Sequence, residues 1–591
     1  MIILLVDPNS MVETALSAVQ RAHPGVPVKI VATGATPPAL PDRVECAYLS
    51  GYSQLTFRER LDTARRFSQS WYYSDGTDCT VWGPISAGAV AEIDFFLFFV
   101  RLIEDVDMLC GLLMRERPER VYLCGANQRY LEALFRAVAP DMPTVRGGRT
   151  RRGRDRAGES SLRAWLKRRG LDRALSFVAN QVLASVHPGF RTRPVPYSCH
   201  VILFEMIVPS SYETLSTAYE QLAAEPVAVL STDPRATLRL LRKGLRPLVL
   251  SEGDSAQARA IEGAARRSLR QTWRRLVQRP PSLRLHGHDL WPLVRAKAHD
   301  FFRFQAALIM REHACLRTLA ERQGWRTTIS SSHLHHFGRL CTVLSDQGGP
   351  ASITIQHGVV GVHTYLPMLA TRIAVWGELV REWFVAQGVD PARVVITGQP
   401  RFKRAKPGDA PPDPLGPGGG VVLIATQPLG GSFQRAVSEA VLAAARALPA
   451  LRFVFRPHPD EPLEQYETAC RASQLPNLVV ERGGLVAALE TASFVITHSS
   501  TVGLEALLLQ RPLIVFNPFG WPEEVPYVSS GAAQEVRDGQ ELAAYLARLL
   551  EAPGAYAAAV RTAQRFVDGY VNFDQQSGER LRELLRTFAS R

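Results

Sequence analysis

Short runs of apolar residues alternate along this chain with longer stretches in which apolar residues recur at helical spacing. Within the first 145 residues, the runs at 2–6, 28–32, 44–49 and 121–124 have the length of buried strands, and residues 11–22 have the spacing of a helix. Strands that alternate with helices predict a parallel sheet covered by helices. No glycine-rich phosphate loop follows the first run, so we assign no nucleotide to this unit.

The same alternation returns twice further along the chain. Strand-like runs form a second series at 201–204, 227–230, 248–250, 327–329, 353–355, 373–375 and 394–396, and a third at 421–425, 453–455, 478–480, 494–496 and 513–516. Proline and glycine between the two series exclude both a helix and a central strand, which predicts a linker. The predicted α/β chain therefore divides into an N-terminal α/β domain (1–145), a basic linker and helix (146–195), a middle lobe (196–406), a Pro/Gly linker (407–420) and a last lobe (421–591).

Composition narrows the class of protein. Of 591 residues, 46% are hydrophobic and 21% are charged, which is ordinary for globular domains and excludes wholesale disorder. The apolar run at 95–100 is flanked by charged residues and is far shorter than the ~20 residues a spanning helix needs, so it predicts a core helix. The N-terminus lacks a basic region and a cleavage site, and the eight cysteines are scattered. We expect a cytoplasmic protein with reduced thiols.

The net charge of +13 favours anionic partners, which include nucleotide diphosphates, acidic glycans and anionic lipid headgroups. Residues 146–156 are rich in arginine and glycine and predict an exposed linker, and the following residues, up to 182, combine helical spacing with basic side chains. One interpretation of 146–182 is peripheral contact with anionic lipid at the inner face of the plasma membrane. The alternative is a solvated linker and an ordinary packed helix. No aromatic-interleaved module accompanies the basic run, so we predict no nucleic-acid binding.

The strongest chemical motif follows the strand-like run at 494–496. Ser499, Ser500 and Thr501 form the turn that leads into a helix, whose unsatisfied N–H groups and dipole attract phosphate. Glu505 lies inside that helix, where a carboxylate can accept two hydrogen bonds from a ribose diol. The alternative is an ordinary serine cap with a surface glutamate.

A second motif follows the run at 453–455. Arg456 is a natural phosphate partner, and two prolines flank His458 and fix its backbone. Ligands gather at strand ends of this kind in open α/β sheets. We therefore expect Arg456 and His458 to bind phosphate together with the serine turn.

A third set of polar residues follows the strands of the middle lobe. Gln356, His357 and Gly358 follow one strand, Glu378 follows the next, and Arg401 follows the last. Since parallel strands end at one edge of a sheet, we expect Gln356, Gly358, Glu378 and Arg401 to line a cleft for donor or acceptor.

The order of these motifs resembles bacterial capsule-polysaccharide transferases, a group that includes the Kdo-transferring capsule enzymes, the polysialyltransferases and the CDP-glycerol glycerophosphotransferases. Residues 497–512 are also similar to the nucleotide-binding segment of the non-hydrolysing UDP-N-acetylglucosamine 2-epimerases, and the whole resemblance covers about 326–519. It implies a GT-B fold of two Rossmann-like lobes with a cleft between them. It also implies phosphate contacts by His458, Ser499 and Ser500, and a ribose contact by Glu505. Where such proteins usually carry an acidic residue, near Ser330, this chain has serines and histidines.

The resemblance implies transfer of a sugar from a nucleotide-sugar donor to a glycan or glycolipid acceptor of the capsule or lipopolysaccharide type. No Asp-x-Asp motif lies in a loop, so we expect metal-independent chemistry with no cofactor. Proton removal from the acceptor needs a base, for which Glu252 and His357 are the candidates. A sugar-nucleotide 2-epimerase, a CDP-glycerol glycerophosphotransferase and a non-catalytic capsule-assembly protein remain alternatives.

Overall fold

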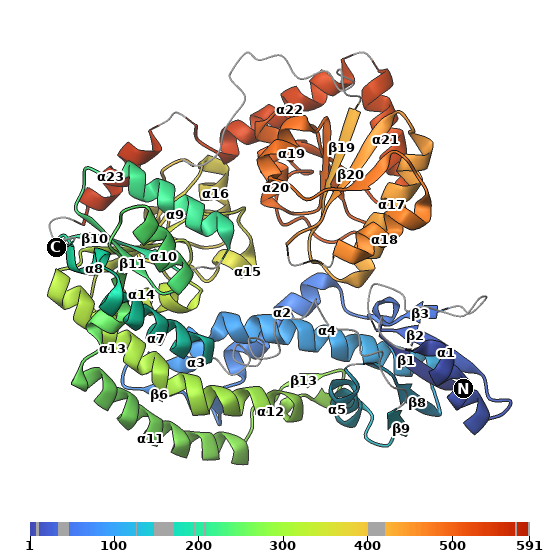
Figure 1. The fold of residues 1–591 in the computed structure, drawn as a ribbon, viewed down its shortest axis with the longest axis horizontal. Helices are drawn as coiled ribbons and strands as arrows, with labels where there is room; N and C mark the ends of the chain where they lie inside the picture. Colours follow the sequence, from blue (N-terminus) through green and yellow to red (C-terminus); the bar gives the residue numbers. More distant parts are fainter. Residues whose placement is uncertain are drawn as a thin grey trace.

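The computed structural model describes residues 1–7, 11–33, 46–125, 127–146, 171–192, 195–205, 208–399, 420–459, 461, 463–552, 554–573 and 576–588. Three parallel sheets follow one another along the chain, each with helices packed on it (Figure 1). The prediction of an α/β protein is confirmed.

The first sheet has the order β3-β2-β1-β8-β9. Its strands are β1 (Ile2–Val6), β2 (Val28–Ala32), β3 (Cys46–Tyr48), β8 (Arg120–Leu123) and β9 (Thr144–Arg146), and its helices are α1 (Val12–Ala22), η1 (Leu49–Tyr52), α2 (Phe57–Ser70), α3 (Ala87–Val90), α4 (Glu92–Glu116) and α5 (Gln128–Val138). Two small hairpins, β4–β5 (Tyr73–Ser74, Thr77–Asp78) and β6–β7 (Val81–Trp82, Ile85–Ser86), lie between α2 and α3. All five residues of β1 are buried, as expected for a strand covered on both faces.

The middle sheet has the order β12-β11-β10-β15-β16-β17-β18. Its strands are β10 (His200–Phe204), β11 (Val227–Ser231), β12 (Leu248–Val249), β15 (Thr327–Ser330), β16 (Ala351–Ile355), β17 (Arg372–Val375) and β18 (Val394–Ile396). The helices are α7 (Leu171–Val186), α8 (Gly189–Thr192), α9 (Pro209–Gln221), α10 (Pro234–Arg242), η2 (Leu250–Gly253), α11 (Ala256–Gln278), α12 (Trp291–Asp300), the π-helical η3 (Phe301–Gln305), α13 (Ala306–Gln323), α14 (His336–Asp346), α15 (Val362–Tyr365), α16 (Glu378–Ala386) and η4 (Pro391–Arg393). A hairpin, β13–β14 (Arg284–Leu285, His288–Asp289), separates α11 from α12.

The last sheet has the order β21-β20-β19-β22-β23-β24. Its strands are β19 (Gly420–Ala425), β20 (Leu451–Arg456), β21 (Leu478–Val480), β22 (Phe494–Thr497), β23 (Leu513–Phe516) and β24 (Ala533–Val536). Its helices are α17 (Gly431–Ala447), α18 (Leu463–Ser473), α19 (Leu485–Thr491), α20 (Thr501–Leu508), α21 (Gly539–Glu551) and α22 (Ala555–Tyr570), and α23 (Ser577–Arg586) ends the chain. In all three sheets the winding reverses beside the first strand, which is where open α/β sheets bind ligands.

The C-terminal helix α23 returns to the middle lobe. Leu581, Leu584 and Leu585 are buried together with Ile202 and Phe204 of that lobe's first strand. The predicted last lobe, 421–591, includes α23, whereas the apolar face of this helix packs against the middle sheet. Two Rossmann-like lobes in succession, connected in this way, form a GT-B fold.

The N-terminal unit shares its core with the long helices of the middle lobe. Trp71, which is fully buried, stacks on Phe95 with ring centroids 3.7 Å apart and meets the edge of Phe301 at 5.3 Å. Phe95, Phe96 and Phe99 are buried, so the predicted core helix at 95–100 is confirmed as part of α4. None of the helices in the described ranges is both long and apolar enough to cross a bilayer.

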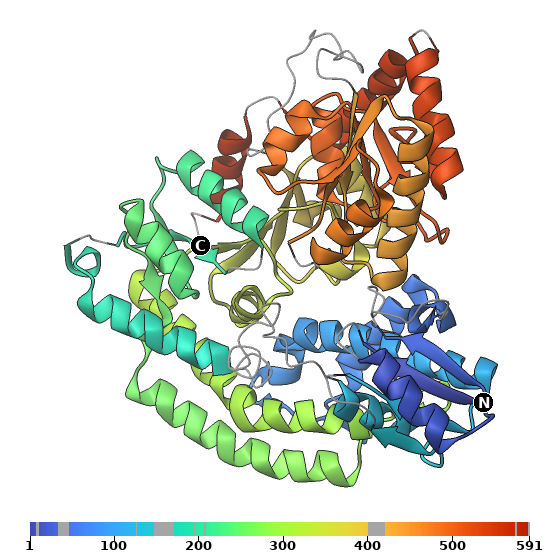
Figure 2. The same cartoon turned by 45° about the vertical axis from the view of Figure 1, so that its right-hand side comes forward.

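The same unit reaches both lobes through the helix pair α2 and α4, which lies beneath them in Figures 1 and 2. On the last-lobe side, Phe57 of α2 stacks on Trp521 with centroids 5.0 Å apart, and Arg435 donates to the hydroxyl of Ser50, which lies in η1 before α2, at 3.0 Å. On the middle-lobe side, Arg65 donates to the carbonyl of His363 at 3.1 Å. One side of the gap between the lobes is therefore bridged by α2.

Candidate functional site

The serine turn lies at the switch point of the last sheet, where β22 follows β19 in the strand order. Ser500 caps α20, since its Oγ accepts the N–H of Val502 at 3.2 Å. The side-chain oxygen of Gln427, at the end of β19, accepts the N–H groups of His498 (3.2 Å) and Ser499 (2.9 Å). Two successive backbone N–H groups therefore already point at one oxygen atom, which is the geometry that a phosphate oxygen also requires.

His458 follows β20, on the other side of β19. The ends of β20 and β22 therefore lie at the same edge of the sheet, two strand spacings or about 10 Å apart. The His458 ring is exposed, and its backbone N–H donates to the carboxylate of Glu461 at 2.8 Å. The structure thus places the His-Pro segment and the serine turn beside one another, on either side of the end of β19.

Glu461 fixes this arrangement, although sequence reasoning did not identify it. It is 8% exposed, and its carboxylate accepts hydrogen bonds from Gln434 Nε2 (2.9 Å), the Tyr466 hydroxyl (2.8 Å) and the Thr426 hydroxyl, besides the N–H of His458. Burial and the Glu461 charge raise the pKa of Tyr466, so the tyrosine remains a donor. The residue after β19, the His-Pro loop and α17 therefore all donate hydrogen bonds to one carboxylate, that of Glu461.

We expect Glu461→Gln to lower the free energy of unfolding by roughly 1–3 kcal/mol, because an amide NH₂ must then face a buried donor. Nucleotide affinity should also fall, since the loop that carries His458 loses its anchor. Urea unfolding and nucleotide titration would measure the two effects. Glu464→Gln, an exposed carboxylate at the start of α18, is the matched control and should change neither. A Glu461→Gln protein of wild-type stability and affinity would contradict the anchoring role.

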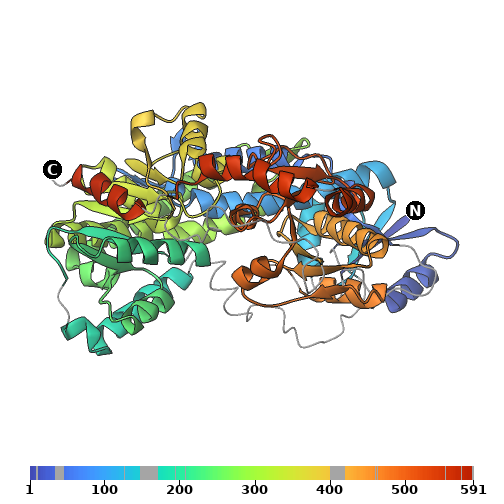
Figure 3. The same ribbon diagram turned by 90° about the horizontal axis from the view of Figure 1, so that it is seen from above.

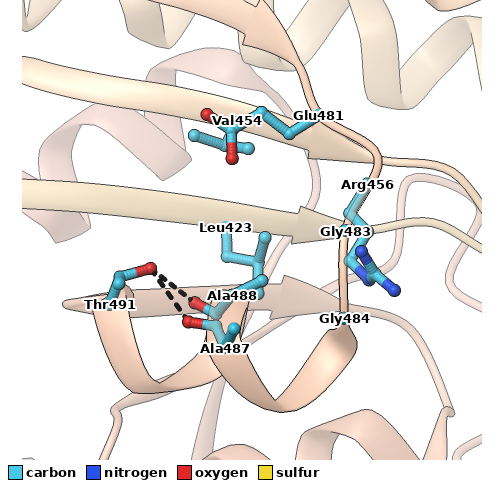
Figure 4. A pocket seen from close by; sticks show the side chains of 9 residues that line it. All are labelled: Leu423, Val454, Arg456, Glu481, Gly483, Gly484, Ala487, Ala488 and Thr491. Atoms are coloured by element: carbon cyan, nitrogen blue, oxygen red, sulfur yellow. Dashed lines mark hydrogen bonds between the residues drawn. The ribbon is translucent and has the colours of Figure 1, made fainter.

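Arg456 lines a pocket of about 220 Å³ in the last lobe (Figure 4). Its walls are Leu423, Val454, Glu481, Gly483, Gly484, Ala487, Ala488 and Thr491. The guanidinium lies beside the Gly483–Gly484 backbone and makes no hydrogen bond or ion pair with any residue in the described parts of the chain. Partial burial lowers its pKa, yet a guanidinium stays charged. An unpaired cation beside an apolar wall is suited to a ligand that is both anionic and partly apolar.

The middle lobe presents His357 at the end of β16. Its Nδ1 lies 2.8 Å from the Ser331 carbonyl oxygen, which can only accept, so the proton is on Nδ1 and the lone pair is on Nε2. Tyr365, whose pKa burial raises to about 12, accepts the backbone N–H groups of His357 (3.1 Å) and Gly358 (3.4 Å) through its hydroxyl. The ring is thus held in the tautomer that a general base requires.

This loop meets the serine turn across the gap between the lobes. The N–H of Val359 donates to Thr501 Oγ1 at 3.3 Å, and a Cβ atom on Gly358 would lie 3.4 Å from the same hydroxyl. The N–H of Val360 donates to Tyr570 of the last lobe at 3.2 Å. The serine turn and the loop that carries His357 are therefore in contact across the gap between the lobes.

Other predicted site residues do not converge on this point. Glu252 follows β12, which β11, β10 and β15 separate from β16, a distance of about 19 Å. Its carboxylate pairs with Arg246 at 2.8 Å and accepts the N–H of Val249. Glu252 and His357 therefore lie at separate places along the sheet edge, and the role of Glu252 as a base stays a prediction.

Gln356 and Glu378 make contacts within the middle lobe. Gln356 is fully buried, donates to the Gly358 carbonyl and accepts the Trp376 N–H, both at 2.9 Å, so it supports the loop rather than lining a cleft. Glu378 is exposed at the start of α16 and pairs with Arg381 at 2.9 Å. Glu505 lies half-buried within α20 and already has an interaction partner. Arg401 lies outside the described residues.

The histidines at 333–336 point to different partners. His333 bonds the Thr354 hydroxyl and the Tyr365 carbonyl, both at 3.0 Å, and burial lowers its pKa to about 4. His336 contacts Glu312 at 2.7 Å. Within the described ranges, no three His, Cys, Asp or Glu side chains come together as metal ligands would.

No protein-family model matches the chain, and no curated protein matches it. Among solved structures it is similar to the UDP-GlcNAc 2-epimerase from Neisseria meningitidis bound to UDP-GlcNAc (12% identity, 66% of this chain and 99% of that chain, TM-score 0.42). It is also similar to the UDP-GlcNAc 2-epimerase from Methanocaldococcus jannaschii (11%, 66% and 99%, 0.40) and to the glycotransferase of kitacinnamycin (15%, 66% and 100%, 0.41). Identities and TM-scores this low carry no argument about activity or substrate.

Proposed function

We propose that the protein is a glycosyltransferase that moves a sugar from a nucleotide-sugar donor to a glycan or glycolipid acceptor of the capsule or lipopolysaccharide type. The observation that carries the proposal is the contact between Thr501 of the serine turn and the loop of His357 and Gly358. It joins a site for an anionic leaving group on one lobe to a poised base on the other.

The leaving group is the nucleotide diphosphate. As the bond from the anomeric carbon to the phosphate oxygen breaks, negative charge develops on that oxygen. The backbone N–H groups and hydroxyls of Ser499, Ser500 and Thr501, together with Arg456 and His458, would stabilise this charge without a metal ion. The apolar wall beside Arg456 would take the nucleoside part of the donor. The amide oxygen of Gln427 would give way to a phosphate oxygen.

The acceptor would approach from the middle lobe. His357 Nε2 takes the proton of the acceptor hydroxyl, whose oxygen then bonds to the anomeric carbon. Ser331 holds the ring through Nδ1 and stabilises the imidazolium that forms. Glu505 would bind the ribose diol, and Arg401 would contribute to the cleft. A place in the cytoplasm, at the inner face of the plasma membrane, fits an acceptor that is built on lipid.

A panel of CMP, CDP, UDP, GDP and their sugars tests the proposal by thermal shift, because a ligand of the folded state raises the melting temperature by mass action. We expect one nucleotide to stabilise the protein and its sugar to be consumed only when an acceptor is present. Conversion of UDP-N-acetylglucosamine to its epimer without an acceptor would instead identify an epimerase. If no nucleotide shifts the melting temperature, the proposed site is wrong.

A further inference from the structure

Helix α7 carries an unpartnered apolar stripe on its outer face. Leu175, Val178, Val182 and Val186 are 51%, 53%, 52% and 67% exposed. At 3.6 residues per turn, these four positions fall within an arc of about 80° along the helix. Among the residues of α7 whose side chains are described, the other exposed ones are Gln181 and Ser185, which are polar and uncharged. No charged side chain of α7 is therefore exposed within that set.

The opposite face of α7 is packed on the middle lobe. Asn180 is buried and hydrogen-bonded to α10, where it accepts the Thr237 hydroxyl at 2.8 Å. Arg173 also points inward, to Gln305 and His336. The orientation of the helix is thus fixed by specific contacts, and the stripe faces outward. Figure 3 shows α7, in teal, on the outer side of the middle lobe, away from the last lobe.

The helix beside α7 carries exposed basic side chains. They are Arg239 and Arg242 of α10 and Lys243, which follows α10 and lies 3.7 Å from the carboxylate of Glu220. Residues 146–170, which precede α7 in the chain, contain ten basic and two acidic side chains, a net charge of +8 within a total of +13. An apolar stripe on the protein surface with basic residues beside it is typical of a helix that lies in the interface of an anionic membrane. Each basic residue near such a surface contributes about 1 kcal/mol of attraction.

We propose that the α7 stripe, together with exposed basic residues of the neighbouring helix α10, docks on a phospholipid bilayer that contains anionic headgroups. The four apolar side chains enter the headgroup region, and the basic residues contact the lipid phosphates. The membrane is favoured over a protein partner because charge and apolar surface occur together and no acidic residue is exposed on α7 to specify a complementary protein face. The proposal is independent of the proposed transferase activity.

Vesicle sedimentation with the full-length protein tests it. We expect wild type to pellet with phosphatidylcholine vesicles that contain about 30 mol% phosphatidylglycerol and to stay in solution with phosphatidylcholine alone. The double variant Val178→Glu/Val182→Glu should bind the anionic vesicles at least about 10-fold more weakly, since two carboxylates replace the apolar contacts. Its melting temperature should equal that of wild type, because both side chains are more than half exposed.

Met114→Glu is the matched control, because Met114 is 58% exposed near the C-terminal end of α4, whose N-terminal end is the part that lies near α7. It should bind vesicles as wild type does. Unchanged vesicle binding by the double variant would overturn the proposal, and so would equal binding of wild type to neutral vesicles. A wild-type dimer that the double variant converts to a monomer would show that the stripe is a protein interface and would overturn it as well.

Discussion

Replacing Arg456 with alanine is expected to abolish the nucleotide-induced thermal shift while leaving the unliganded protein folded. A hydrogen bond between charged partners contributes about 1.5–3 kcal/mol, so the dissociation constant for the nucleotide should rise by roughly 10- to 100-fold. The fold should not suffer, because the guanidinium bonds no residue within the described ranges. Calorimetric titration of the nucleotide that the panel identifies would measure the change.

Arg452→Ala provides the comparison for this variant. Arg452 lies on the same strand, is exposed, and pairs with Glu481 at 2.6 Å. Exposed ion pairs contribute little, so this variant should bind nucleotide as wild type does. Equal losses in the two variants would show that general positive charge on β20, rather than the position of Arg456, attracts the ligand.

Replacing His357 with asparagine should lower kcat by roughly 10²- to 10⁴-fold without changing nucleotide affinity. Asparagine keeps an N–H donor near the position of Nδ1 and can still bond the Ser331 carbonyl. It has no basic nitrogen to take the place of Nε2. Turnover at saturating donor and acceptor, together with nucleotide titration, would separate loss of the base from loss of binding.

The second candidate base supplies the contrast. Glu252→Gln should retain wild-type turnover, since the carboxylate lies at the β12 flank and is engaged by Arg246. An active His357→Asn enzyme, or an inactive but folded Glu252→Gln enzyme, would move the base away from the interlobe loop.

The N-terminal unit links the two lobes to each other through α2. Because α2 contacts Trp521 at one end and His363 further along, any closure of the lobes must preserve or break those contacts. A ligand of the proposed interlobe site would therefore enter from a side that α2 does not cover.

The elements of the fold could be read from the sequence because strands buried on both faces leave near-continuous apolar runs. The runs at 421–425 and 494–496 appear in the structure as β19 and β22. The short, partly exposed β24 and the two-stranded hairpins carry no such signal, and no prediction included them.

The candidate site was predicted only in part. Motif order pointed to Arg456, His458 and the serine turn, and the structure places them at one edge of the last sheet. The sequence did not indicate the roles of Gln427 and Glu461. A polar residue after a strand gives the same sequence pattern whether its side chain faces solvent or a neighbouring loop. For Glu252, the sequence showed a position after a strand, but it did not show that this strand lies at the flank of the sheet away from β16.

The sequence by itself determined the three α/β units, the strand ends that carry polar residues, and the concentration of positive charge before residue 171, because periodicity and composition are local properties. Only the tertiary structure decided that β20 and β22 flank β19, that the His357 loop meets Thr501, that α2 spans both lobes, and that the stripe on α7 faces outward. The physical reason is that hydrogen bonding between strands and packing between helices join residues that are distant in the chain, and neither leaves a pattern in the local sequence.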